Sequence, residues 1–221
     1  MPGYEVRHLE LEVGPKPYRL RVLRDLQQFS DPDGHGARLG ISSAQWSLFG
    51  QVWPAAELLA LAMDSFNIED KRILEVGCGI GLPSLVLQRR GAQVVASDIH
   101  PLAESFLAYN SAMNGLPSVH FRNMDWDAPL PSLGMFDVII ASDVMYERDH
   151  ALLLAGLVER HALPVAEVVI TDPGRGSGGL FTRLLHAQGF ALDPPLPVVA
   201  ATLPAHTPRV LHFRRTQVPR C

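Results

Sequence analysis

Short apolar runs alternate along the chain with longer amphipathic stretches. One run begins at Ile73 and the next ends at Asp98. Three more cover 119–124, 136–142 and 165–171. Between and around them, helices are predicted over 54–63, 101–114, 149–161 and 180–188. Strands that alternate with helices in this way indicate an α/β fold built on a doubly wound sheet, in which the central strands are parallel and buried on both faces.

Further strands are predicted near the two ends of the chain. Residues 4–23 alternate apolar and polar positions in two runs around a Gly-Pro-Lys-Pro turn, which is typical of a β-hairpin. The Gly, Asp and Pro residues of 29–40 predict a loop, in which His35 carries no catalytic signal of its own. Runs at 198–203 and 209–214 predict an antiparallel addition to the sheet.

We therefore expect one α/β domain over 1–221, a length that can bury a sizeable core. It would consist of an N-terminal hairpin and loop over 1–45 and a cofactor-binding catalytic fold over 46–221. The sheet would be Rossmann-like and seven-stranded, with an antiparallel C-terminal strand.

The first candidate site is the segment ILEVGCGIG, in which a strand runs into a turn with glycines at every second position. Glycine lets a ligand come close to bare backbone, and Pro83 suits the first turn of the helix that should follow. A strand, a glycine turn and a helix N-terminus together form a nucleotide-binding corner. Asp98 ends the next apolar run, at the distance where such folds place an acid on a ribose.

The spacing of the glycines argues against a dinucleotide. The G-x-G-x-x-G fingerprint needs a third glycine where Leu82 stands, so an NAD oxidoreductase fits poorly. Glu75-x-Gly77-x-Gly79-x-Gly81 instead resembles the first motif of the class I, seven-β-strand, S-adenosylmethionine-dependent methyltransferases.

Three other segments resemble the family-16 branch of these enzymes. Gly50, Trp53 and Pro54 before an Ala/Leu helix are similar to the segment that precedes its first motif. Asp143-x-x-Tyr146 resembles the acid-x-x-aromatic motif of its lysine methyltransferases. The tetrad DPGR at 172–175 is similar to one in the lysine methyltransferases of electron transfer flavoprotein β-subunit, although Pro-Gly is also an ordinary type II turn.

The resemblance implies S-adenosyl-L-methionine as the cofactor and gives roles to individual residues. Trp53 would lie against its methionine end, while Asp125 and Trp126, an acid and an aromatic after a strand, would bind and stack the adenine. Asp143 and Tyr146 would border the methyl acceptor as the catalytic pair. The expected cofactor-binding residues are Trp53, Glu75, Gly77, Gly79, Gly81, Asp98, Ile99, Asp125, Trp126, Ala141 and Ser142.

Composition and charge limit the kinds of partner and the cellular location that we expect. A net charge of −4 gives no broad basic surface for nucleic acid. No apolar stretch approaches the roughly 20 residues that span a bilayer, and the first residues carry acids that a signal peptide avoids. Cys78 and Cys221 are poorly placed for a disulfide or a metal site. We therefore predict a cytoplasmic protein without a metal.

The function that these features favour is methyl transfer to a lysine side chain of a protein substrate. The motifs describe the cofactor better than the acceptor, so a small-molecule, nicotinamide-like N-methyltransferase is the alternative within enzymes. A non-catalytic cofactor-binding module is the alternative from another class. The intact glycines together with SDVMY argue against such a module.

Overall fold

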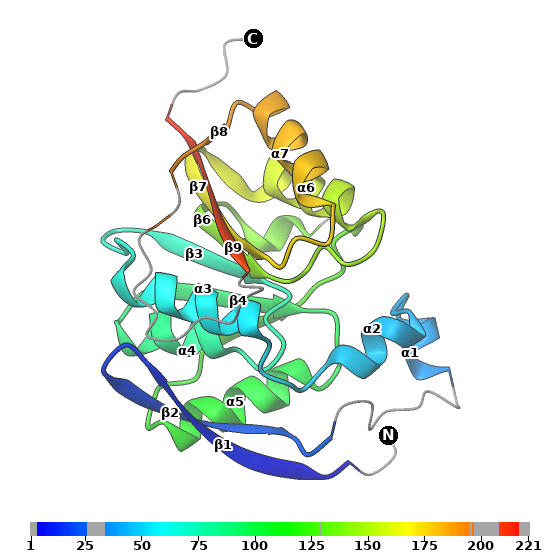
Figure 1. Cartoon of the computed structure of the whole chain (residues 1–221), viewed down its shortest axis with the longest axis vertical. Helices are drawn as coiled ribbons and strands as arrows, with labels where there is room; N and C mark the ends of the chain where they lie inside the picture. Colours follow the sequence, from blue (N-terminus) through cyan, green and yellow to red (C-terminus); the bar gives the residue numbers. More distant parts are fainter. Residues whose placement is uncertain (1–3, 26–33, 129, 195, 197–207, 217–221) are drawn as a thin grey trace.

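The computed structural model describes residues 4–25, 34–128, 130–194, 196 and 208–216. Its centre is a seven-stranded sheet in the order β5-β4-β3-β6-β7-β9-β8 (Figure 1). The strands are β3 (Arg72–Val76), β4 (Gln93–Asp98), β5 (His120–Asn123), β6 (Phe136–Ser142), β7 (Ala162–Asp172), β8 (Ala191–Leu192) and β9 (Arg209–Arg215). The neighbouring strands β5, β4, β3, β6 and β7 are parallel, whereas β9 is antiparallel to its neighbours β7 and β8. The predicted fold class is therefore confirmed.

The C-terminal strands differ in part from the prediction. β9 lies where the run at 209–214 predicts it, whereas the predicted strand at 198–203 falls outside the described residues. The seventh strand of the sheet is β8, which has only two residues and pairs Ala191 with Arg214 and Leu192 with Phe213. A two-residue strand is too short to show the alternation by which strands are recognised in a sequence.

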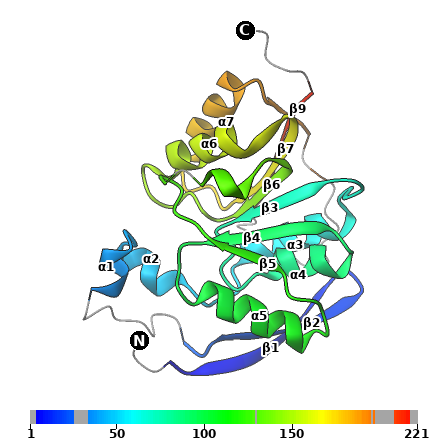
Figure 2. The ribbon, with the colours of Figure 1, turned by 180° about the vertical axis from the view of Figure 1, so that it is seen from behind.

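Helices cover both faces of the sheet. They are α3 (Pro54–Ser65), α4 (Leu82–Arg89), α5 (Ala103–Met113), α6 (His150–His161) and α7 (Gly178–Ala187), with a 3₁₀ turn at Pro131–Leu133. Val138 and Ile140 of β6 belong to a core shared with α3, α4 and α5. Ile139 and Ala141, which alternate with them, belong to a second core shared with α6 and α7. Figures 1 and 2 show α6 and α7 gathered beside β6, β7 and β9. Among the described residues, none of these helices has the length and apolarity needed to cross a membrane.

The N-terminal hairpin forms a separate two-stranded sheet of β1 (Val6–Val13) and β2 (Lys16–Leu23), as predicted. It lies along α5 in both views of the molecule (Figures 1 and 2). The side-chain amides of Asn110 in α5 and of Asn114, the C-cap of that helix, bind the backbone of β2. Asn110 exchanges hydrogen bonds with Arg21, and Asn114 does so with Arg19, at distances of 2.7 to 3.4 Å between nitrogen and oxygen.

This contact corrects the expected face of α5. Periodicity predicts an apolar stripe through Leu102, Phe106, Tyr109 and Met113, but Tyr109 is 40% exposed. The buried positions of the helix are Ala103, Phe106, Leu107, Asn110 and Ser111. The helix is therefore rotated from the predicted face, because its polar asparagines serve the hairpin.

A short segment connects the hairpin to the sheet. It holds α1 (His35–Arg38) and α2 (Ser43–Leu48), so the loop predicted over 29–40 is wrong at 35–38, where the backbone is helical. Residues 29–33 and the side chain of His35 lie outside the described parts. Ile41, Trp46 and Phe49 are buried, which makes this segment part of the main body of the protein.

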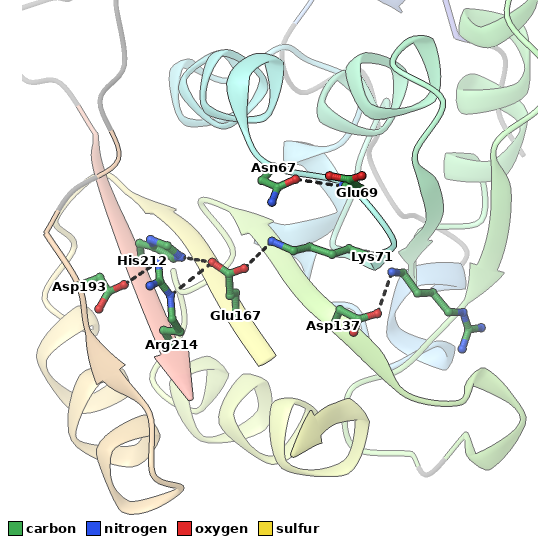
Figure 3. Close-up of polar contacts among 9 residues, drawn as sticks. Asn67, Glu69, Lys71, Asp137, Glu167, Asp193, His212 and Arg214 are labelled. Carbon is green, nitrogen blue, oxygen red and sulfur yellow. Dashed lines mark hydrogen bonds and ion pairs between the residues drawn. The ribbon is translucent and has the colours of Figure 1, made fainter. Parts of the chain in front are cut away.

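A charged network joins β7 and β9 to Lys71, the residue just before β3, away from the carboxyl ends of the sheet (Figure 3). Glu167 of β7 lies at its centre: its two carboxylate oxygens are each 2.7 Å from one partner nitrogen, Nζ of Lys71 and Nε2 of His212. Nε of Arg214 is 3.7 Å away. These interactions lower the pKa of Glu167 to about 2, the bond from His212 most strongly.

Candidate active site

A cavity of about 390 Å³ opens at the carboxyl ends of β3, β4, β5 and β6. The chain leaves β3 toward β4 on one side and returns to β6 on the other, so the cavity lies at the switch point where ligands bind in open α/β sheets. Ten predicted site residues line it, namely Trp53, Gly77, Gly79, Asp98, Ile99, Asp125, Trp126, Ser142, Asp143 and Tyr146.

The glycine turn and the end of β4 form one wall of this cavity. Oδ2 of Asp98 accepts a 2.8 Å hydrogen bond from the N–H of Gly79, and Oδ1 accepts one of 2.8 Å from the N–H of His100. A Cβ at Gly79 would meet no heavy atom within 4 Å, so the turn faces open space. Burial raises the pKa of Asp98, while the two N–H donors act in the opposite direction.

Glu75, Gly81 and Ala141 lie behind the cavity wall. Glu75 is fully buried and accepts hydrogen bonds from the N–H, at 3.0 Å, and the hydroxyl of Ser84 in the first turn of α4. Burial raises the pKa of this carboxyl to about 8. Glu75 thus holds the start of α4 against β3.

The other two buried positions serve packing. Ala141 packs in the core beneath α6 and α7. Gly81 has a φ of 86°, and a Cβ there would overlap Cδ1 of Leu107. Gly81 therefore lets α5 approach the turn closely.

Residues that follow β5 form the opposite wall. Oδ1 of Asp125 accepts a 3.0 Å hydrogen bond from the N–H of Asp127, which closes a tight turn. The ring of Trp126 lies edge-on to the ring of His150, with centroids 5.4 Å apart. Asp125 is exposed at the rim and Trp126 is half-buried, so a carboxylate and an aromatic face are both presented to the cavity.

Asp143 and Tyr146 come from the loop between β6 and α6. Asp143 has a left-handed backbone with φ of 50°, and its N–H donates a 2.9 Å hydrogen bond to the carbonyl of Thr171. Its carboxylate accepts two hydrogen bonds of 3.0 Å from the guanidinium of Arg175, in a fork. The positive φ aims the side chain across to the turn that follows β7.

The Tyr146 ring packs edge-on against His150, with centroids 4.8 Å apart. Partial burial raises the pKa of its hydroxyl, and the nearby carboxylates of Asp98, Glu147 and Asp143 raise it further. The hydroxyl is therefore a neutral hydrogen-bond donor over the physiological range of pH.

Part of the cavity wall was not predicted. Ile41, Leu48 and Phe49 reach it from the segment before α3, and Oγ of Ser42 donates a 2.7 Å hydrogen bond to Oε1 of Glu147. The stretch QWSLF lies just before a predicted helix, where aromatic residues are typical of packing against the helix. Arg175 belongs to the DPGR tetrad, in which no single residue was assigned to the site.

His100 is a further lining residue that sequence reasoning missed. Its ring stacks on Phe49, with centroids 3.9 Å apart, and lies 4.7 Å from the ring of Trp46. Nδ1 accepts a 3.2 Å hydrogen bond from the N–H of Leu102. Burial lowers the pKa of the imidazole to about 3, so it is neutral at physiological pH.

Comparison with known proteins adds family evidence to this geometry. A family model described as "Lysine methyltransferase" matches residues 38–175. The chain is 33% identical over 156 residues to the histone-arginine methyltransferase METTL23 of Xenopus laevis, covering 66% of this chain and 65% of that protein. It is 28% identical over 158 residues to the electron transfer flavoprotein beta subunit lysine methyltransferase of Mus musculus, covering 68% and 54%. The chain thus spans about half to two thirds of the length of these relatives.

Solved structures with the same fold are more distant in sequence. A 16S rRNA methyltransferase of T. thermophilus superposes with a TM-score of 0.65 at 19% identity, covering 98% of this chain and 52% of that one. The magnesium protoporphyrin IX methyltransferase of Synechocystis, solved with bound SAM, gives 0.57 at 18% identity, covering 73% and 78%. At this identity the likeness concerns the fold alone.

Proposed function

Because the chain belongs to the lysine methyltransferase family, we propose that it transfers a methyl group from S-adenosyl-L-methionine to the side-chain amine of a lysine in a protein. The observation that carries the proposal is that the Asp143 and Tyr146 pair opens on the same cavity as Asp98 and the glycine turn. A protein acceptor is supported by relatives whose names state that they methylate proteins.

The cavity has the chemical groups that this cofactor needs. Each carboxylate oxygen of Asp98 accepts a 2.8 Å hydrogen bond from a backbone N–H, and a carboxylate has further lone pairs, which we assign to the ribose hydroxyls. Trp126 offers a ring face to the adenine, and the exposed carboxylate of Asp125 can accept from its amino group. The open space before Gly79 leaves room for the methionine part. When bound, the cofactor supplies a methyl group on a cationic sulfur.

The protein must then present a neutral amine in a dry site. The reference pKa of lysine is about 10.4, so only around one amine in 2,500 is neutral at pH 7. We assign Tyr146 to align the amine through its ring or its hydroxyl. Ile41, Phe49 and Met124 line the same cavity with apolar surface, which excludes water from the bound acceptor.

The direct test is a labelling experiment. The purified protein is incubated with methyl-labelled S-adenosylmethionine and an extract of cells that lack it, and macromolecules are separated from small solutes. We expect label in a discrete protein band, on lysine after hydrolysis, and we expect Tyr146→Ala to abolish it. Tyr109→Ala is the matched control, because Tyr109 lies on α5, packs on His8 and does not line the cavity.

Other outcomes point to other functions. Label confined to small solutes would favour a small-molecule N-methyltransferase. Label on arginine would reassign the acceptor to the type named for the Xenopus laevis relative. Cofactor binding without any label would favour a non-catalytic module.

A further inference from the structure

Arg175 and Asp143 form a bidentate charged pair in the wall of the cavity. Nε and Nη2 of Arg175 each lie 3.0 Å from one oxygen of the Asp143 carboxylate, which is the bidentate geometry of a strong pair. The Asp143 side chain is 13% exposed and that of Arg175 is 51% exposed. The two residues follow adjacent parallel strands, in which Ser142 of β6 is in register with Thr171 of β7.

The surroundings of this pair are acidic. Among the described residues that line the cavity, Arg175 is the one lysine or arginine, whereas five carboxylates line it. Asp172 of β7 also interacts electrostatically with Arg175. Apart from Asp143, the carboxylates that line the cavity come from three directions. They are Asp98 after β4, Asp125 after β5, and Glu147 and Asp149 before α6. The remaining titratable residues that line the cavity are His100, which burial keeps neutral, and Tyr146 and His150, whose rings pack together.

A bare carboxylate would hinder methylation of an amine. An acid within about 4 to 6 Å of an ammonium favours the charged form and raises its pKa by about 1 to 3 units. The neutral amine, already scarce at pH 7, would become about 10 to 1,000 times scarcer. Pairing with a guanidinium offsets the charge of the carboxylate, yet leaves each oxygen a lone pair with which to orient the amine.

We propose that Arg175 is a positioning residue that neutralises and fixes Asp143, so that the acceptor lysine meets a charge-compensated pair and releases its proton to water near neutral pH. In this step the ammonium loses one proton to a water molecule and keeps the nitrogen lone pair, and no other bond changes. The inference rests on the proposed function, because it requires that the acceptor is an amine bound beside Asp143.

The test is the dependence of kcat on pH with the protein acceptor. Arg175→Gln removes the charge but keeps a planar amide, so kcat at pH 7 should fall about 10- to 100-fold. The acidic limb of the profile should move up by about 1 to 2 pH units, and the two enzymes should converge toward pH 10. Arg175→Lys keeps the charge, so its limb should stay near the wild-type position.

Two further variants separate charge from structure. Asp143→Asn alone should move the limb downward, because Arg175 then acts on the ammonium without compensation. Arg209→Gln is the matched control: this exposed arginine lies 3.7 Å from Asp172 but outside the cavity, and its loss should leave the profile unchanged. Thermal shifts with adenosylhomocysteine verify that each variant is folded and binds the cofactor product.

The inference is overturned if Arg175→Gln lowers kcat by the same factor at every pH, or if it leaves kcat unchanged. Should that variant fail to fold, an unmoved limb in Asp143→Asn overturns the inference by itself. A wild-type enzyme that labels no lysine contradicts the proposed function as well. If the wild-type enzyme labels lysine but the acidic limb of the pH profile moves in neither variant, only this inference is contradicted.

Discussion

The N–H of Gly79 lies 2.8 Å from Oδ2 of Asp98, so the turn after β3 and the end of β4 are joined through a side chain. The other oxygen of the same carboxylate accepts the N–H of His100. One acid therefore sets the shape of the cavity wall and also presents its remaining lone pairs to a ligand. Geometry of this kind makes the site preorganised rather than assembled on binding.

Replacement of Asp98 by alanine should weaken the binding of adenosylhomocysteine. A hydrogen bond to a charged group contributes about 1.5 to 3 kcal/mol, so the Kd should rise about 10- to 100-fold. Titration calorimetry measures the change. Asp137→Ala is the control, because Asp137 also accepts a backbone N–H, that of Arg72 (Figure 3), but is not among the residues that line the cavity. Equal losses of affinity in both variants would refute the ribose assignment.

Alanine at two neighbouring glycines should separate stability from binding. Both positions have positive φ, but a Cβ at Gly81 would overlap Leu107, whereas one at Gly79 would enter open space. Gly81→Ala should cost about 2 to 4 kcal/mol of unfolding free energy, from strain and overpacking together. Gly79→Ala should cost about 1 to 2 kcal/mol and chiefly weaken cofactor binding. Urea unfolding with a parallel binding titration checks both, and a reversed order would be incompatible with this packing.

Glu167 should contribute stability that disappears in acid. Its pKa is about 2 in the folded protein and near 4.5 when unfolded, so the folded state binds fewer protons between these values. The contribution is complete above about pH 4.5 and is lost as the pH falls toward 2. Glu167→Gln should lower the unfolding free energy by about 1 to 3 kcal/mol at pH 7 and by little near pH 2. The same difference at both pH values would exclude an ionic origin.

Glu75 should act with the opposite sign. Its folded pKa of about 8 exceeds the unfolded value of about 4.5, so the folded state holds an extra proton between them and stability falls as the pH rises. The slope should approach about 1.4 kcal/mol per pH unit in that interval. Glu75→Gln keeps the shape and removes the charge, so its unfolding free energy should be flatter between pH 5 and pH 8. A mutant with an unchanged slope would show that Glu75 is ionised when folded.

The sequence was most informative where a signal is local. Apolar runs that end in an acid or a glycine predicted β3, β4 and β6, and hence the placement of Asp98 and Asp143 at one edge of the sheet. Parallel strands bring their carboxyl ends together, so residues far apart in the chain could be assigned to one cavity in advance.

Contacts between distant segments left no such signal. Ser42 and Glu147 are 105 positions apart, and neither position has a periodicity that names its partner. The fork between Arg175 and Asp143 needs the register of β6 against β7, which the order of residues does not give. The rotation of α5 escaped prediction for the same reason, because the buried amide of Asn110 finds its backbone partners in distant segments, at Arg21 of the hairpin and at Ile80 of the glycine turn.

Asn110 and Asn114 also affect whether β2 can pair with a further strand. At Arg19 and Arg21 the side-chain amides take the backbone N–H and C=O that a further strand would use, so a helix stands in for that strand. The outer edge of β2 is thereby closed to edge-to-edge pairing at these two residues. Loss of both amides would expose a row of unsatisfied peptide groups, which is the starting point of sheet-mediated aggregation. Two polar side chains at helical spacing therefore cover part of a strand edge that would otherwise be open.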